Sequence, residues 1–182
     1  MIRLFVALLI PDEVKSIVFD HCNSITENSS EYRWEEKEKI HLTLKFIGEV
    51  KEELLSKIIN EIEFVGNFFS FNCSISKFGF FYKFNEAKIL WCNLDTDDSI
   101  ISLVDELNLR LKKFNIEPET RKFKGHLTLM RIKRKVSEDF IRTVKEYKFS
   151  PVKFIANEIA LVQSVLKPTG SEYKVLKIYE LK

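Results

Sequence analysis

Two short segments of the sequence combine a histidine with a threonine two residues later. Residues 41–44 and residues 126–129 both read His-Leu-Thr-Leu, and these motifs contain two of the only three histidines in the chain. Side chains alternate between the two faces of a β-strand, so His41 and Thr43 would share one face, and His126 and Thr128 would do the same in their strand. We expect the leucines to lie in the core and the His and Thr side chains to face a site.

Two imidazoles and two hydroxyls that meet at one point can cleave a phosphodiester without a metal ion. One His would act as the general base on the attacking oxygen and the other as the general acid on the leaving oxygen, while Thr43 and Thr128 would bind the phosphoryl oxygens. Imidazole suits both roles because its reference pKa is about 6.5. A zinc site is a poor match, because His41 and His126 have no third ligand in a motif. We therefore expect no metal and no cofactor.

The motifs belong to a longer internal repeat. The apolar run at 4–8 aligns with residues 90–94 at an offset of 86, and the motifs align at an offset of 85. Apolar residues at helical spacing follow each run, and the acidic openings Glu52-Glu53 and Glu138-Asp139 begin a second helix in each copy. Each copy thus reads strand, helix, His-x-Thr strand, helix, with the motifs inside segments near 3–65 and 89–148. A period this long that occurs twice indicates duplication and fusion of one lobe.

Further strands are predicted between and after the two copies. Residues 68–81 and 87–94 are rich in Phe, Ile and Trp, and the polar segment between them predicts a hairpin. A C-terminal hairpin is predicted over 155–181, with its turn at Lys167-Pro168-Thr169-Gly170. Helices interleaved with hairpin-linked strands favour an α+β fold with antiparallel or mixed sheets. We predict that residues 1–182 form a single bilobal domain, two duplicated lobes around a central cleft.

Composition limits the classes of protein that remain. The net charge is +2, which is too balanced to hold nucleic acid through the overall field, so an RNA partner would be bound locally. The longest apolar run, residues 4–10, is far shorter than the roughly 20 residues that span a bilayer, so we expect no membrane helix and no membrane partner. The three cysteines lack Cys-x-x-Cys spacing, which favours a reducing compartment and a cytoplasmic location.

Two features near the motifs bear on phosphate or RNA binding. By strict alternation Lys45 shares the face of His41 and Thr43, so it is a candidate phosphate ligand, although an exposed lysine without that role is an alternative. Residues 121–135 contain seven Lys or Arg and no acidic residue. This basic stretch would concentrate positive charge around His126 and attract a polynucleotide backbone or a single phosphate, or it would form a solvated face.

With its flanks, the sequence resembles the two-histidine phosphoesterase superfamily, specifically the RNA 2′,3′-cyclic phosphodiesterases also called 2′-5′ RNA ligases. The resemblance rests on residues 3–7, 41–49 and 126–131 and on the late Ser164, Gly170 and Tyr173, and it covers nearly the whole chain. It implies a bilobal fold with the active site between the lobes. It also implies hydrolysis of a terminal 2′,3′-cyclic phosphate on RNA to a 2′-phosphomonoester without metal or nucleotide cofactor, and reversible ATP-independent 2′-5′ joining of tRNA halves.

The same resemblance implies roles for individual residues. His41 would be the acid that protonates the departing 3′ oxygen, and His126 would be the base that activates water; spacing alone does not fix this order. Thr43 and Thr128 would bind phosphate. Arg131 matches a frequent arginine of the family, but strict alternation places it on the Leu face, so it would reach phosphate only through a bulge or a twist.

The residues leave two alternatives open. One is a non-catalytic RNA-binding module that uses the basic stretch at 121–135. The other is a two-histidine enzyme that acts on a small cyclic nucleotide or on ADP-ribose cyclic phosphate, because the catalytic parts would be shared and the shape of the pocket would decide the substrate. For the enzyme, the expected partners are RNA ends or tRNA halves that carry a 2′,3′-cyclic phosphate, with no obligate protein partner.

Overall fold

The computed structural model describes residues 1–25, 32–168 and 170–182, so Thr169 of the predicted C-terminal turn lies outside the described residues. The strands are β1 (Ile2–Leu9), β2 (His41–Val50), β3 (Phe71–Ile75), β4 (Phe78–Lys83), β5 (Glu86–Asn93), β6 (His126–Arg131), β7 (Val152–Ala156), β8 (Glu158–Lys167) and β9 (Gly170–Glu180). The α-helices are α1 (Asp12–Ser24), α2 (Leu55–Ile62), α3 (Ser99–Leu111) and α4 (Glu138–Glu146). None of the helices in these ranges has the length and apolar character needed to cross a membrane.

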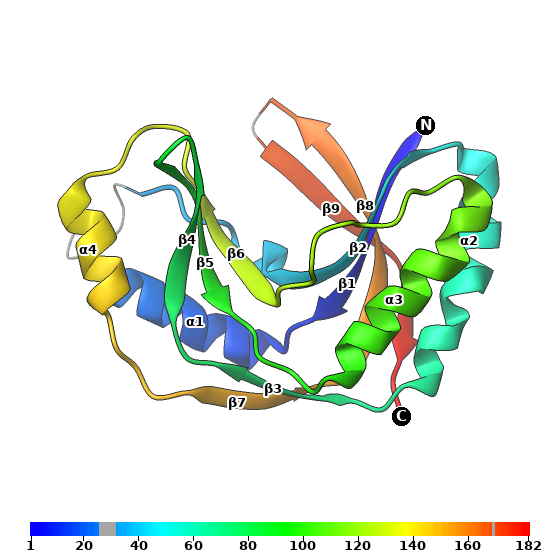
Figure 1. Cartoon of the computed structure of the whole chain (residues 1–182), viewed down its shortest axis with the longest axis horizontal. Helices are drawn as coiled ribbons and strands as arrows, with labels where there is room; N and C mark the ends of the chain where they lie inside the picture. Colours follow the sequence, from blue (N-terminus) through cyan, green and yellow to red (C-terminus); the bar gives the residue numbers. More distant parts are fainter. Residues whose placement is uncertain (26–31, 169) are drawn as a thin grey trace.

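The strands form one large and one small antiparallel sheet. The large sheet has the order β4-β5-β6-β2-β1-β8-β9, and β3 pairs with β7 in the small one. All the recorded strand pairs are antiparallel, so the predicted α+β fold with antiparallel sheets is confirmed. Figure 1 shows β3 and β7 running together below the large sheet, joining its two ends.

The large sheet is nearly divided at its centre. The motif strands β2 and β6 are neighbours, but their register holds a single pair, Leu42 with Leu127. On one side of this junction lie β1, β8 and β9, and on the other lie β5 and β4. Two half-sheets therefore diverge from the motif strands, and each half-sheet has helices beside it (Figure 1). This divergence gives the two-lobed shape that the repeat predicts.

Each lobe contains one helix from each copy of the repeat. Helix α1 packs near the end of α4, where His21 Nδ1 lies 3.1 Å from the Tyr147 hydroxyl. Helices α2 and α3 pack together in the other lobe, where Arg110 lies 3.4 Å from the Glu61 carboxylate. Figure 1 shows α1 and α4 on the side of β4 and β5, with α2 and α3 on the opposite side. The two copies are thus interlocked, which no linker or composition change in the sequence reveals.

Two expected strands are each interrupted. The prediction of one strand over residues 68–81 is wrong: β3 ends at Ile75 and β4 begins at Phe78 in the other sheet. At the break, Oδ1 of the Asn93 side chain accepts hydrogen bonds from the backbone N–H groups of Ser76 and Lys77, both at 2.9 Å. At the C-terminal hairpin, residues 155–156 belong to β7, and β8 begins at Glu158. The chain passes from the small sheet to the large one at both places.

Candidate active site

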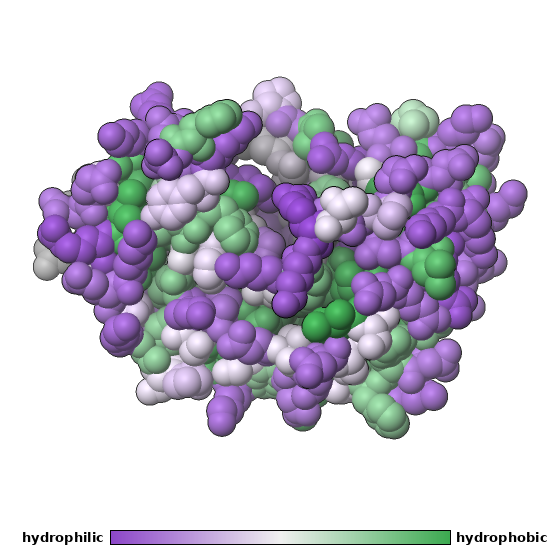
Figure 2. Space-filling view, viewed as in Figure 1, coloured by the Kyte–Doolittle hydropathy of each residue, from purple (hydrophilic) through white to green (hydrophobic). Residues whose placement is uncertain are grey.

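The two His-x-Thr motifs meet in one cleft between the lobes. The cleft has a volume of about 320 Å³ and is lined by side chains from both half-sheets: Arg3, Phe5, Glu35, Lys39, His41, Thr43, Phe46, His126, Thr128, Arg131, Ser164, Leu166, Ser171 and Tyr173. Figure 2 shows a hollow between the two halves of the molecule with hydrophilic side chains at its rim. The motif leucines Leu42, Leu44, Leu127 and Leu129 are all buried, so the predicted division of faces within each motif is confirmed.

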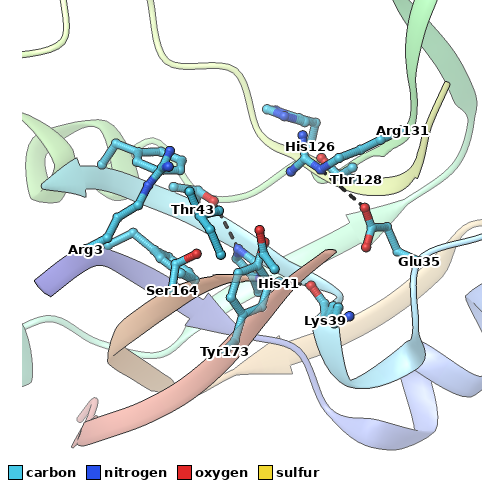
Figure 3. A pocket seen from close by; sticks show the side chains of 14 residues that line it. Arg3, Glu35, Lys39, His41, Thr43, His126, Thr128, Arg131, Ser164 and Tyr173 are labelled. Carbon is cyan, nitrogen blue, oxygen red and sulfur yellow. Dashed lines mark hydrogen bonds and ion pairs between the residues drawn. The ribbon is translucent and has the colours of Figure 1, made fainter. Parts of the chain in front are cut away.

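Both histidines are held by the same backbone interaction. Nδ1 of His41 lies 2.7 Å from the carbonyl oxygen of Lys39, and Nδ1 of His126 lies 2.8 Å from that of Lys124. A carbonyl only accepts, so Nδ1 carries the proton in each ring and Nε2 holds the lone pair of the neutral form. Nε2 of His41 lies 3.1 Å from the Thr43 hydroxyl (Figure 3). Each ring therefore keeps Nε2 as the nitrogen that can exchange a proton with a substrate.

Each histidine packs against aromatic side chains and is partly buried, and burial affects its protonation. Phe5 stacks on His41 with ring centres 4.9 Å apart, and Phe81 meets His126 edge to face at 4.8 Å. Burial lowers the pKa of His41 to about 4 and also lowers the pKa of His126, and the positive charge of Arg131 acts in the same direction on both. Both rings are thus neutral near neutral pH, and a bound anion would favour protonation of either one.

Each motif strand carries a bulge directly after its Thr. Opposite β1, Lys45 pairs with Val6 and Thr43 pairs with Ala7, which leaves Leu44 without a partner. Opposite β5, Met130 pairs with Leu90 and Thr128 pairs with Trp91, which leaves Leu129 without a partner. An extra residue changes the face to which the following side chains point. The two bulges are 85 residues apart, the same offset as the motifs.

The bulges decide which residues after the motifs reach the cleft. Phe46 and Arg131 both line the cleft. Arg131 therefore lies on the same side as His126 and Thr128, because the bulge supplies the change of face that strict alternation does not. The expectation that Lys45 shares the face of His41 is wrong. Lys45 is only 4% exposed, its Nζ donates a 2.5 Å hydrogen bond to the carbonyl oxygen of Glu117, and burial lowers its pKa. Lys45 is therefore not a candidate phosphate ligand.

An acidic residue that the sequence did not single out also lines the cleft. The carboxylate of Glu35 lies 3.2 Å from Nε of Arg131, and Figure 3 shows it on the cleft side of the guanidinium. Glu35 stands in an irregular segment, beside the Trp34 to Met130 bridge. No motif or period marks that position, so only the fold reveals it.

The basic stretch at 121–135 is largely exposed near the second motif. Lys124 lies over the rings of Trp91, at 4.7 Å, and Phe81, at 5.4 Å, and so packs beside His126. Arg121 is paired with Glu119 at 3.1 Å. Lys133, Arg134 and Lys135 are exposed on the segment that follows β6. Among the described residues, no three His, Cys, Asp or Glu side chains are grouped so that they could hold a metal ion.

The sequence matches a known family in both halves. A family model described as LigT-like phosphoesterase matches residues 9–91 and residues 93–173, and each segment includes one His-x-Thr motif. The chain belongs to this family. The predicted membership of the two-histidine phosphoesterase superfamily is thereby confirmed, and so, at the level of the family, is the predicted enzyme class.

Relatives align with this LigT-like phosphoesterase over nearly its whole length. It is 31% identical to the RNA 2′,3′-cyclic phosphodiesterase of Archaeoglobus fulgidus over 180 residues, which cover 98% of this chain and 99% of the relative. It is 29% identical to the protein of the same name from Thermotoga maritima over 175 residues, which cover 96% and 92% of the two chains.

Solved structures support the fold. The crystal structure of TT0787 from Thermus thermophilus superposes with a TM-score of 0.80 at 23% identity and covers 98% of this chain and 97% of its own. The structure of E. coli LigT complexed with 3′-AMP superposes with a TM-score of 0.77 at 20% identity, covering 100% and 98%. The two-lobed architecture of this LigT-like phosphoesterase is thus shared with proteins of low sequence identity.

Proposed function

We propose that this LigT-like phosphoesterase hydrolyses the terminal 2′,3′-cyclic phosphate of RNA to a 2′-phosphomonoester, without a metal ion or a nucleotide cofactor. The observation that carries the proposal is the convergence of His41 and His126 in one cleft, each with Nδ1 bound to a backbone carbonyl and Nε2 left for the substrate. The name that its curated relatives share, RNA 2′,3′-cyclic phosphodiesterase, supports the same substrate.

In the proposed reaction, one water molecule is consumed and one phosphorus–oxygen bond is broken. Nε2 of His126 accepts a proton from the water as its oxygen bonds to phosphorus. When the anionic substrate binds, it favours protonation of His41, and Nε2 takes up a proton from solvent. The bond from phosphorus to the 3′ oxygen then breaks, and Nε2 of His41 gives this proton to that oxygen. The 2′ oxygen keeps the phosphate. Loss of the proton from His126 to solvent restores the starting state, and His41 takes up a proton again when the next substrate binds.

The remaining cleft residues would bind the phosphoryl group. Thr43 and Thr128 present hydroxyls beside the two imidazoles, and Arg131 can offer its two terminal nitrogens to the same oxygens. Donors fixed in place before the reaction stabilise charge on these oxygens at no cost of reorganisation. The asymmetry between Phe46 and Arg131, which hold equivalent positions, makes the two halves of the site chemically different and is compatible with one acid and one base.

The same geometry also suits ligation, which we propose as a second activity. A 5′-hydroxyl of another RNA end would replace water, lose its proton to His126 and form a 2′-5′ phosphodiester when the 3′ oxygen departs. The energy comes from the strained cyclic phosphate, so no ATP is needed, and the reaction can run in reverse. tRNA halves, which the resemblance implies as substrates, would be one source of such ends.

We propose that the RNA chain upstream of the reactive phosphate contacts the basic stretch at 121–135, since its exposed cations lie near His126. We place the enzyme in the cytoplasm, because all three cysteines are free buried thiols and a reducing compartment suits them.

The proposal is tested by comparing substrates in the presence of EDTA. An RNA oligonucleotide that ends in 2′,3′-cyclic phosphate should be hydrolysed with a higher kcat/KM than the corresponding cyclic mononucleotide, and the product should carry phosphate on the 2′ oxygen alone. Faster turnover of the mononucleotide or of ADP-ribose cyclic phosphate would favour a small-molecule enzyme. Salt-sensitive RNA binding without any product would favour a binding module.

A further inference from the structure

Glu35 places a negative charge in a cleft that has to bind an anion. Its side chain is 22% exposed, and its Oε1 lies 3.2 Å from Nε of Arg131. The backbone fixes its position, because the Glu35 N–H donates a 2.7 Å hydrogen bond to the carbonyl oxygen of Leu129, the bulged residue of β6. The carboxylate is therefore held at the cleft by the same strand that carries His126, Thr128 and Arg131.

The pairing leaves Arg131 able to bind phosphate. A guanidinium has five N–H donors, and the Glu35 carboxylate engages the one on Nε. The two terminal nitrogens stay available for phosphoryl oxygens. Glu35 is thus compatible with an anion on Arg131, but that anion also experiences the nearby negative charge.

The charged side chains among the described residues that line the cleft sum to +2. Arg3, Lys39 and Arg131 are its cations, and Glu35 is its anion. Lys39 is further paired with Glu36, which lies outside the lining, at 3.1 Å. Both histidines are neutral near neutral pH because burial lowers the pKa of each. With Glu36 counted and both histidines neutral, the net charge is +1, which matches a ligand with one negative charge better than a ligand with two.

The proposed substrate and product differ in this respect. A cyclic phosphodiester carries one negative charge, whereas a phosphomonoester carries about 1.5 to 2 at pH 7, because its second pKa is about 6. The Coulomb energy of repulsion from a fixed carboxylate is proportional to the charge of the ligand. Glu35 therefore acts about twice as strongly on the product as on the substrate.

We propose that Glu35 is a specificity-determining residue that makes the cleft select singly charged phosphodiesters over doubly charged phosphomonoesters. The assignment of the monoester as product rests on the proposed function, while the selectivity between anions does not. In catalysis the same repulsion promotes release of the 2′-phosphomonoester and limits inhibition by product.

Binding of two simple anions at pH 8 tests the selectivity without any turnover. The probes are methyl phosphate, a monoester with about two charges, and dimethyl phosphate, a diester with one, each titrated by NMR into the full chain. If Glu35→Gln raises the affinity for dimethyl phosphate about 3-fold, it should raise the affinity for methyl phosphate about 10-fold. Doubling the charge of the ligand doubles the repulsion energy and so squares the factor in affinity. Glu35→Asp, which keeps the charge, should leave the ratio of the two affinities within about 2-fold of the wild-type ratio.

A matched control separates this effect from a general change in charge. Glu106→Gln removes a carboxylate that pairs with Arg110 on α3, outside the cleft, and should not change either affinity. An equal change for both anions in Glu35→Gln, weaker binding of both, or no binding to any variant would overturn the proposal. Turnover of cyclic-phosphate RNA by wild type, measured separately, reports on the proposed function and leaves the outcome for the two anions unaffected.

Discussion

Phe46 and Arg131 occupy equivalent positions in the two copies of the repeat, and both reach the cleft because a bulge precedes them. The bulged residues, Leu44 and Leu129, are followed by a second buried residue, Lys45 in one strand and Met130 in the other. Duplication thus preserved a backbone irregularity together with the His-x-Thr motif. In only one copy is the residue that the bulge turns toward the cleft a cation, so the two halves of the site have different chemistry.

Replacing Arg131 with Met should lower kcat/KM for the cyclic phosphate by about 10²-fold, because a charged donor to the phosphoryl oxygens is lost while the length of the side chain is kept. Arg131→Lys should recover part of the activity through its charge. Steady-state kinetics on folded variants checks this. Activity within a factor of two of wild type for Arg131→Met would exclude a phosphate contact.

The acid and base roles predict different responses to a substrate with sulfur at the 3′ position. A thiolate leaves without protonation, so His41→Ala should lose less than 10-fold on this substrate although it loses about 10² to 10⁴ on the normal one. His126→Ala should lose activity on both, because water must still be activated. Single-turnover rates with the two substrates measure this. If the sulfur-containing substrate restored the activity of His126→Ala and not that of His41→Ala, the assignment of acid and base would be reversed.

Burial of His41 also predicts that stability depends on pH. The pKa of His41 is lowered from 6.5 to about 4 by burial, so between these values the unfolded chain binds a proton that the folded one does not. The contribution of neutral His41 to the free energy of unfolding is fully present above pH 6.5 and is lost as the pH falls toward 4. The loss is up to about 3 kcal/mol, at about 1.36 kcal/mol per unit of pKa shift.

Urea unfolding at pH 7.5 and pH 5 measures this loss, and His41→Gln, which cannot titrate, should lose less stability between the two pH values than the wild type. The same pH dependence in both proteins would mean that His41 titrates normally when folded.

We expect Lys45 to contribute to the stability of the fold and not to substrate binding. Lys45→Met, which copies Met130 at the equivalent position, should leave KM within about 2-fold of wild type and cost about 1 kcal/mol of unfolding free energy through the hydrogen bond to Glu117. Lys45→Ala should cost more, because it also leaves a cavity. Kinetics and thermal melts of the two variants test this. A tenfold rise in KM for the folded Lys45→Met protein would restore Lys45 as a phosphate ligand.

The sequence reveals those parts of the fold that have a period or a motif. The repeat predicts the two motif strands and the helices that follow, because apolar spacing records a buried face directly. Exchange of helices between the lobes leaves no such record, since α1 would show the same apolar face against either half-sheet. At the break before β4 the backbone is bound by the side chain of Asn93, 16 residues beyond Lys77, and no local pattern at residues 76–77 indicates this contact.

Candidate site residues were predictable to the extent that alternation holds. His41, Thr43, His126 and Thr128 precede the bulges, so their common face follows from strand geometry alone. Beyond the bulges alternation fails, which misplaces Lys45 and leaves Arg131 undecided. Glu35 contacts Arg131 from an irregular segment 96 residues away, a relationship that needs the fold.

The central claim, that His41 and His126 act together on one phosphorus atom, is tested most directly by the double variant His41→Ala, His126→Ala. Wild type, each single variant and the double variant are incubated in EDTA with RNA that ends in 2′,3′-cyclic phosphate, and the 2′-phosphorylated product is quantified. Each single variant should lose about 10² to 10⁴ in rate, and the double variant should be hardly slower than the worse single one, since a coupled acid and base fail together. Full activity in the double variant would contradict the account.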